Sequence, residues 1–188
     1  MTPPPNLPAK NGPIALRSQK SGGGVRILGV DPGLRVTGYG VIEVAKNFSL
    51  GHDIELVEAG IIRTDQRSGI AARLARIHDA LAEVIGEFRP DVLAIEKLYA
   101  HYKHPATAIL MGHARGVVCL LSGTQKVPLV NIASTHIKKA VTGHGHAGKL
   151  QIQRMVQHYL SLKNLPGPPD AADALAIALS YAFSINKR

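Results

Sequence analysis

The sequence predicts a mixed α/β domain built on a five-stranded sheet with helices on its faces. Three strand-like segments come first, and no segment between them is long enough for a helix, which is typical of an antiparallel meander. Strand-like and helical segments then alternate along the rest of the 188 residues. This alternation favours parallel strands added to the same sheet, with the helices packed against it.

The three leading strands are predicted from apolar and β-branched runs bounded by turn residues. The first covers residues 26–30 and ends at the turn Asp31-Pro32-Gly33, because Pro and Gly favour turns. The second covers residues 36–44 and the third covers residues 54–63.

A change of period marks the first helix. Apolar residues recur at three- and four-residue spacing over residues 70–88, which predicts an amphipathic helix that Arg89-Pro90 ends. Residues 91–95 are a short apolar run, typical of a strand in a sheet covered on both faces. A second helix is predicted over residues 105–122, with Pro105 in its first turn.

The C-terminal part contributes one more strand and three helices. The strand is predicted at 127–132 and the helices at 134–143, 149–162 and 170–185. Ser134 is expected to cap the first of these helices. The Pro-rich residues 165–169 are expected to form a stiff connector before the last one.

The first 24 residues differ in composition from the rest. They contain five prolines, a run of three glycines and no acidic residue, so we expect a disordered basic tail at 1–24. Residues 25–188 are expected to form a single domain. No stretch approaches the roughly 20 apolar residues of a membrane span, so no membrane is expected among the partners.

The charge of the chain favours a polyanionic partner. Lys and Arg number 22 and Asp and Glu 13, a formal net charge of +9. A protein that is merely basic remains an alternative, since charge alone does not establish DNA binding. The single cysteine, Cys119, excludes a disulfide framework within the chain, and its apolar neighbours predict a buried thiol.

Four acidic residues stand at positions suited to a metal site. Asp31 follows the first strand, Glu96 follows the central apolar strand, and Asp170 and Asp173 share a face of the last helix. Carboxylates that converge raise one another's pKa unless a cation joins them. Hard divalent ions prefer such oxygen ligands, and two of them suit in-line attack on a phosphodiester.

Each acid also has a simpler explanation. Asp31 could shape its turn, Glu96 could pair with Lys97 or an arginine, and the two helical acids could interact with the helix dipole. Spacing alone does not decide between these alternatives and a shared site.

Five blocks of sequence resemble the RuvC family of Holliday (crossover) junction endodeoxyribonucleases, members of the RNase H-like superfamily. The longest is ILGVDPGLRVTGYGVI at 27–42. The others, in the same order as in the family, are AIEK at 94–97, GHARG at 112–116, KKAVTG at 138–143 and DAADALAIA at 170–178.

The resemblance implies an RNase H-like fold and a metal-dependent nuclease. It implies symmetric nicking of four-way junction DNA in recombination and repair, with Mg²⁺ as cofactor, two ions per site, and Mn²⁺ as a substitute. The family's catalytic and metal-binding acids fall on Asp31, Glu96, Asp170 and Asp173; some relatives carry His at the third position. A bacterial, cytoplasmic and nucleoid-associated location is also implied.

The resemblance also suggests positions that face DNA. The family's stacking aromatic falls on Tyr99, although the loop after it is longer here and leaves Tyr102 as an alternative. The basic cleft falls on Lys138 and Lys149. Further expected DNA contacts are Lys103, Arg35 and Arg115, with Lys139 and Arg154 as weaker candidates.

Two nicks of matching polarity require two active sites related by a two-fold axis. The helix at 105–122 is apolar on more than one face, which fits burial against its own sheet and against a partner copy in a homodimer. A helix buried wholly within one domain is the alternative. The resemblance further implies cooperation with the RuvA–RuvB branch-migration complex.

Three other functions are considered. A phosphotransferase of the actin-like ATPase type needs two such domains, and 188 residues supply one. A non-catalytic junction-binding protein would not need the full set of acids. A nuclease acting on RNA–DNA hybrids would share both the fold and the acids.

Overall fold

The computed structural model describes residues 23–45, 53–98 and 105–186, and the tail predicted at 1–24 lies outside them except for its last two glycines. The strands form one sheet in the order β3-β2-β1-β4-β5. Their bounds are β1 Val25–Asp31, β2 Val36–Val44, β3 Ile54–Arg63, β4 Val92–Glu96 and β5 Leu129–Ile132. The first three are antiparallel, and β4 and β5 are added in parallel, which confirms the predicted mixed sheet.

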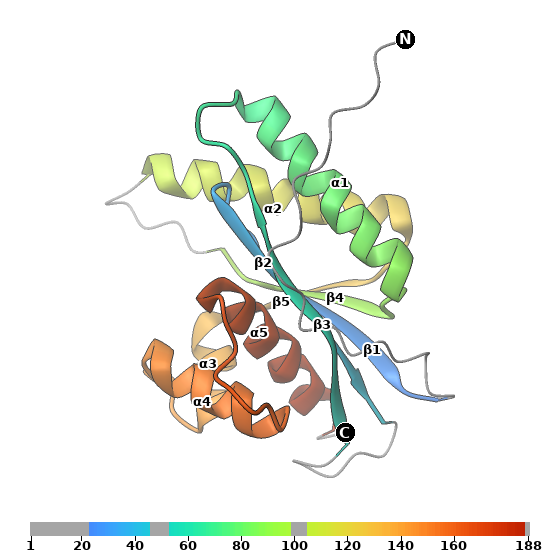
Figure 1. Cartoon of the computed structure of the whole chain (residues 1–188), viewed down its shortest axis with the longest axis vertical. Helices are drawn as coiled ribbons and strands as arrows, with labels where there is room; N and C mark the ends of the chain where they lie inside the picture. The colour runs from blue at the N-terminus through green and yellow to red at the C-terminus, as the bar shows by residue number, and fades with distance from the viewer. Residues whose placement is uncertain (1–22, 46–52, 99–104, 187–188) are drawn as a thin grey trace.

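Helices cover the sheet in two layers (Figure 1). The helices are α1 Ile70–Phe88, α2 Pro105–Gln125, α3 Ser134–Thr142, α4 Lys149–Tyr159 and α5 Pro169–Ile185. α1 and α2 lie on one face, and α3, α4 and α5 lie on the other. Both faces are therefore buried, as the apolar β4 predicts.

The two layers bury alternate residues of the central strands. Ile27 of β1 packs in the core under α5, and Leu28 packs in the core under α1 and α2. In β4, Ala94 lies on the α5 face and Ile95 on the opposite one. Because side chains alternate along a strand, this register places the strand-end residues on the α5 face.

α5 packs directly on the backbone of β1 and β2. Gly29 and Gly40 are paired across these strands, and a Cβ at Gly29 would overlap the backbone of α5 at Ala174. A Cβ at Gly40 would overlap the side chain of Leu175. Glycine at both positions lets α5 approach the sheet more closely than side chains would allow.

Most predicted bounds agree with the structure to within one residue, and three elements differ by more. α2 continues to Gln125, where Lys126 adopts a left-handed conformation with φ 55°. β5 then begins only at Leu129, because the Val127 amide donates to Ser122 O in closing that turn. α4 ends at Tyr159 rather than 162, close to the left-handed Ser161.

Two local predictions were wrong. Ser134 is the first residue of α3 and not its cap, since Ala133 holds the cap position without a side-chain hydrogen bond. Cys119 is exposed rather than buried. The helical period explains this result, because Ala114, Val118 and Leu121 form the buried face of α2 and Cys119 lies off that face.

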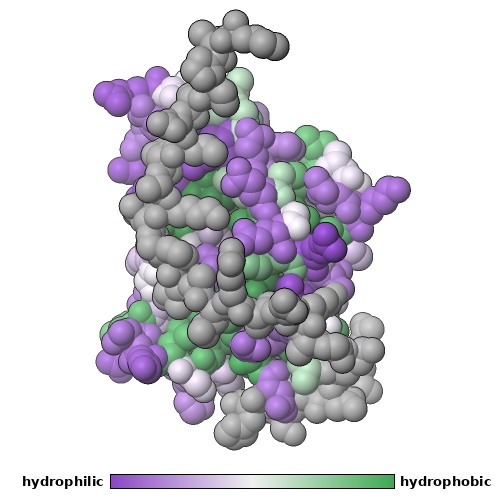
Figure 2. Space-filling view, turned by 45° about the vertical axis from the view of Figure 1, so that its right-hand side comes forward, coloured by the Kyte–Doolittle hydropathy of each residue, from purple (hydrophilic) through white to green (hydrophobic). Residues whose placement is uncertain are grey.

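Outside the grey atoms, the face in Figure 2 shows hydrophilic side chains with hydrophobic areas between them. Within the described ranges, no helix has the length and apolar character needed to cross a membrane.

Candidate active site

Asp31 and Glu96 end two neighbouring parallel strands. Asp31 is the last residue of β1 and Glu96 the last residue of β4, and the two strands pair up to Val30 and Ile95. The alternation of side chains places both carboxylates on the α5 face of the sheet. Two acids far apart in the sequence are thus brought to the same end of the sheet.

Asp31 lies in a partly buried and strongly acidic environment. Burial and, after it, the nearby charges of Asp173, Glu96 and Asp170 together raise its pKa from 3.8 to about 7. Lys149 acts in the opposite sense. A role limited to shaping the turn after β1 would not explain this environment.

Asp170 and Asp173 enter the same site from the start of α5. Asp170 lies in the first turn of the helix, and Asp173 lies one turn further on the same face. The pKa of Asp173 is raised, mainly by burial and also by Asp170 and Glu96, while the lysines at 149 and 138 lower it.

Lys149 forms an ion pair with one of these acids. Its Nζ lies 3.8 Å from Oδ2 of Asp173, and its side chain is 81% exposed. An ion pair so exposed contributes little to stability, so this lysine remains available for another anion. Lys138 acts on the same carboxylate through its charge.

The four carboxylates have the chemistry of a divalent-cation site. They supply only oxygen donors, and burial together with their mutual repulsion raises the pKa of Asp31 and of Asp173. In the part of the chain that the structure describes, no three His, Cys, Asp or Glu side chains form a compact ligand set. The acids act on one another by charge at this end of the sheet.

The sequence matches one family over most of its length. The RuvC family, described as crossover junction endodeoxyribonuclease RuvC, matches residues 27–181. The chain is 44% identical over 160 residues to the crossover junction endodeoxyribonuclease RuvC of Rhodopirellula baltica, covering 85% of this chain and 87% of that protein. It is 43% identical over 152 residues to that of Pseudothermotoga lettingae, covering 81% and 90%.

The chain belongs to the RuvC family.

Solved structures agree with this assignment. The T. thermophilus RuvC in complex with a Holliday junction substrate superposes with a TM-score of 0.79 at 33% identity, covering 87% of this chain and 96% of that one. The yeast mitochondrial Holliday junction resolvase Ydc2 gives a TM-score of 0.61 at 12% identity, which shows a shared fold. The predicted RNase H-like fold is thereby confirmed.

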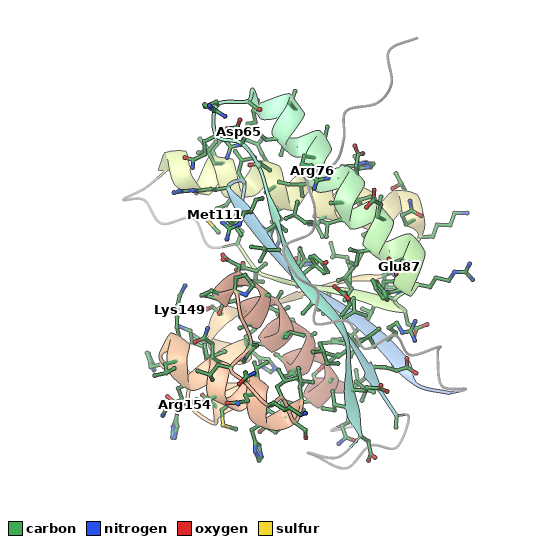
Figure 3. All side chains as sticks on the ribbon, in the orientation of Figure 1. Asp65, Arg76, Glu87, Met111, Lys149 and Arg154 are labelled. Carbon is green, nitrogen blue, oxygen red and sulfur yellow. The ribbon has the colours of Figure 1, made fainter. Side chains whose placement is uncertain are left out.

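Several positions expected to face DNA in this RuvC-family chain can be located. Arg35 is exposed in the turn between β1 and β2, and its guanidinium donates to the side-chain amide oxygen of Gln66. Lys149 and Arg154 lie on the α4 side of the molecule, below the sheet in Figure 3. Tyr99, Tyr102 and Lys103 lie outside the described residues.

The positive charge of the chain is concentrated in one segment, which the motif-based reasoning missed. Residues 97–169 contain nine Lys and Arg and no Asp or Glu. The formal charge of this segment is therefore +9, equal to the net charge of the whole chain. The remaining residues carry 13 basic and 13 acidic side chains, which cancel. This segment includes α2, β5, α3 and α4, and two of its lysines, Lys138 and Lys149, act by charge on Asp173.

Arg115 is placed differently from the other expected DNA contacts. Its guanidinium donates to the main-chain carbonyl of Glu96 and to the side chain of Asn131. The sequence left open that an arginine pairs with the Glu96 carboxylate. Arg115 does not form that pair, because its bond reaches the backbone oxygen of Glu96 and not the carboxylate.

Proposed function

We propose that this protein is a structure-specific endonuclease that resolves four-way (Holliday) DNA junctions in homologous recombination and repair. It hydrolyses phosphodiesters symmetrically in a metal-dependent reaction that leaves 5′-phosphate and 3′-hydroxyl ends. The observation that carries the proposal is that Glu96, Asp170 and Asp173 all act by charge on Asp31 at one end of the sheet, in a member of the RuvC family.

The four acids divide their roles by position. Asp31, Glu96 and Asp170 hold a divalent metal pair, which we take to be Mg²⁺ or, as a substitute, Mn²⁺, and Asp173 completes the site. When bound, such ions supply an attacking water of lowered pKa and neutralise charge on the leaving 3′ oxygen. Because the pKa of Asp31 is raised to about 7, a bound cation would favour its ionised form.

The basic residues beside the acids bind the DNA backbone. Lys149 and Lys138 act electrostatically on Asp173, so a phosphate held by either lies next to the carboxylates. Arg35 is exposed in the turn that follows Asp31, and we include it in this DNA-binding surface. The acid-free segment 97–169 supports the same placement, because it attracts a polyanion towards the site.

α2 supports a homodimer. Its buried face packs in the core through Ala114, Val118 and Leu121. Its remaining surface exposes four large apolar residues, Ile109, Leu110, Met111 and Leu120, at 61%, 45%, 39% and 57%. A second copy covering this surface would place two active sites about a two-fold axis, as paired nicks require.

Family membership suggests the cellular setting. We place the protein in the bacterial cytoplasm, associated with the nucleoid, and expect it to act with the RuvA–RuvB branch-migration complex. The residues from 25 onward are taken as one nuclease domain.

A nicking assay tests the proposal. A synthetic four-way junction, a linear duplex and an RNA–DNA hybrid are incubated with the protein in Mg²⁺ or in EDTA. Paired symmetric nicks in the junction, only with metal, are expected. Junction binding with no nicking at any metal concentration would instead indicate a non-catalytic junction-binding protein, and preferential cleavage of the hybrid would replace the substrate.

A further inference from the structure

Arg115 connects three elements around the acids. From α2, its Nη1 donates to the main-chain oxygen of Glu96 at 2.6 Å, at the end of β4. Its Nη2 donates to Oδ1 of Asn131 in β5. Since neither bond uses the Glu96 carboxylate, the guanidinium restrains the backbone of this residue and leaves its carboxylate free for a ligand.

These bonds act where support from the sheet ends. The pairing of β4 with β1 stops at Val30 and Ile95, one residue before Glu96. On the other side, Glu96 pairs with Ile132, and the Lys97 amide donates to Ile132 O at 2.8 Å. At Glu96 the register of β4 thus continues only with β5, and strand ends open more readily than strand centres.

The base from which Arg115 extends is rigid. Ala114 and Val118 of the same helix are 0% and 1% exposed in the core shared by α1, α2 and the sheet. An arginine suits the task because its planar guanidinium presents donors in fixed directions to two acceptors. A lysine in the same place has a single nitrogen and no fixed fork.

We propose that Arg115 is a positioning residue that holds Glu96 at the end of β4 for metal binding, with Asn131 orienting its guanidinium. This inference rests on the proposed metal-dependent function of the same site. It differs from a phosphate contact, which would act on DNA affinity and not on the metal.

The test compares four substitutions with one control. Arg115→Gln removes the paired donors, and Arg115→Lys keeps the charge but not the fork. Asn131→Ala removes the orienting acceptor, and Asn131→Asp retains one. Lys126→Gln removes one positive charge from the turn after α2 and serves as the control, because no role at the site is assigned to it.

Three measurements are made on each full-length variant. Mn²⁺ binding is followed by its EPR signal with the protein alone and with the junction complex. Junction binding is measured in EDTA as a function of salt. Thermal unfolding in EDTA reports whether each variant is folded.

Arg115→Gln is expected to weaken Mn²⁺ binding about 10- to 100-fold, the usual effect of losing an outer-shell partner. Junction affinity in EDTA and its salt slope are expected to stay unchanged. Arg115→Lys and Asn131→Ala are expected to give smaller losses of Mn²⁺ affinity. Asn131→Asp and Lys126→Gln are expected to bind Mn²⁺ as the wild type does.

Unchanged Mn²⁺ affinity, with a salt slope reduced by about 0.9, would make Arg115 a phosphate contact and overturn the proposal. If Arg115→Gln does not fold, the Asn131 pair decides, and equal Mn²⁺ affinities of Asn131→Ala and Asn131→Asp would overturn it. A wild-type protein that binds Mn²⁺ in an Arg115-dependent way but nicks no junction would refute the proposed function and leave the positioning role intact. A wild-type protein that binds no Mn²⁺ would refute both.

Discussion

The backbone of Asp170 occupies the space that a side chain at Gly38 would fill. A Cβ built on Gly38 would overlap the Asp170 carbonyl and come within 3.2 Å of the Ala171 amide nitrogen. Gly38 is also the register partner of Asp31 across β1 and β2. The missing side chain therefore sets how closely the first turn of α5 approaches the carboxylate of β1.

Gly38→Ala is expected to displace the start of α5 and to weaken metal binding and junction nicking together. Overpacking of this kind typically costs about 1–3 kcal/mol of stability. Urea unfolding and Mn²⁺ binding measure the two effects. The matched control is Gly86→Ala, at an exposed position of α1 where a Cβ meets nothing within 4 Å. This variant is expected to gain about 0.5–1 kcal/mol in free energy of unfolding. A Gly38→Ala protein with normal Mn²⁺ affinity would show that α5 is not held in place by this contact.

The raised pKa of Asp31 makes the metal-free protein less stable at high pH. The folded pKa is about 7 and the ordinary value 3.8. The neutral carboxyl is favoured in the fold, so its contribution is fully present below 3.8 and is lost as pH rises through 7. Asp31→Asn resembles the neutral form, so it should exceed the wild type in stability at pH 8 by up to a few kcal/mol.

Urea unfolding in EDTA at pH 5, 6, 7 and 8 measures this difference. The advantage of Asp31→Asn is expected to shrink steadily below pH 7. The same variant should lose nicking while keeping junction affinity, because the basic residues and not this carboxylate bind the backbone. Parallel pH profiles of the two proteins would contradict the assignment of the shift to Asp31.

The sheet and its flanking helices were predictable because their signals are local. The apolar spacing over 70–88 gave the bounds of α1, and alternating runs bounded by turns gave β2 and β3. Helix ends were less predictable, because Lys126 and Ser161 adopt left-handed conformations. A glycine at such a position would have indicated the helix end, and neither residue is glycine. Cys119 is exposed although its sequence neighbours are apolar, because adjacent residues of a helix lie on different faces. The helical spacing of residues 114, 118 and 121 indicates the buried face of α2.

The acids of the site were predictable as strand-end and helix-face residues, but their surroundings were not. The sequence motif around Arg115 suggested a DNA contact, whereas its bonds reach Glu96 and Asn131, which are 19 and 16 residues away. Such partners depend on how α2 crosses the sheet. The acid-free segment 97–169 needed only a count along the chain.

Lys149→Ala is expected to weaken junction binding and to reduce its salt slope by about 0.9, as the loss of one phosphate contact does. Stability should hardly change, because the 3.8 Å pair with Asp173 is 81% exposed on the lysine side. Fluorescence anisotropy of a labelled junction from 50 to 200 mM salt in EDTA provides the measurement. Lys149→Arg keeps the charge and should keep the slope, whereas an unchanged slope in Lys149→Ala would exclude a phosphate contact.

Leu120→Glu is expected to convert the proposed dimer to a monomer that remains folded. Leu120 is 57% exposed on the surface of α2 that faces away from its own core, so a charge there is tolerated in one copy but opposes burial against a second. Light scattering after gel filtration gives the mass, and thermal unfolding checks the fold. Leu165→Glu, at a residue 45% exposed in the connector before α5, is the control and should stay dimeric. If both variants keep the wild-type mass, the apolar surface of α2 is not the interface, and the two-fold arrangement must use another face. If Leu120→Glu becomes monomeric, nicks on opposite strands should no longer be paired, because each active site then acts alone.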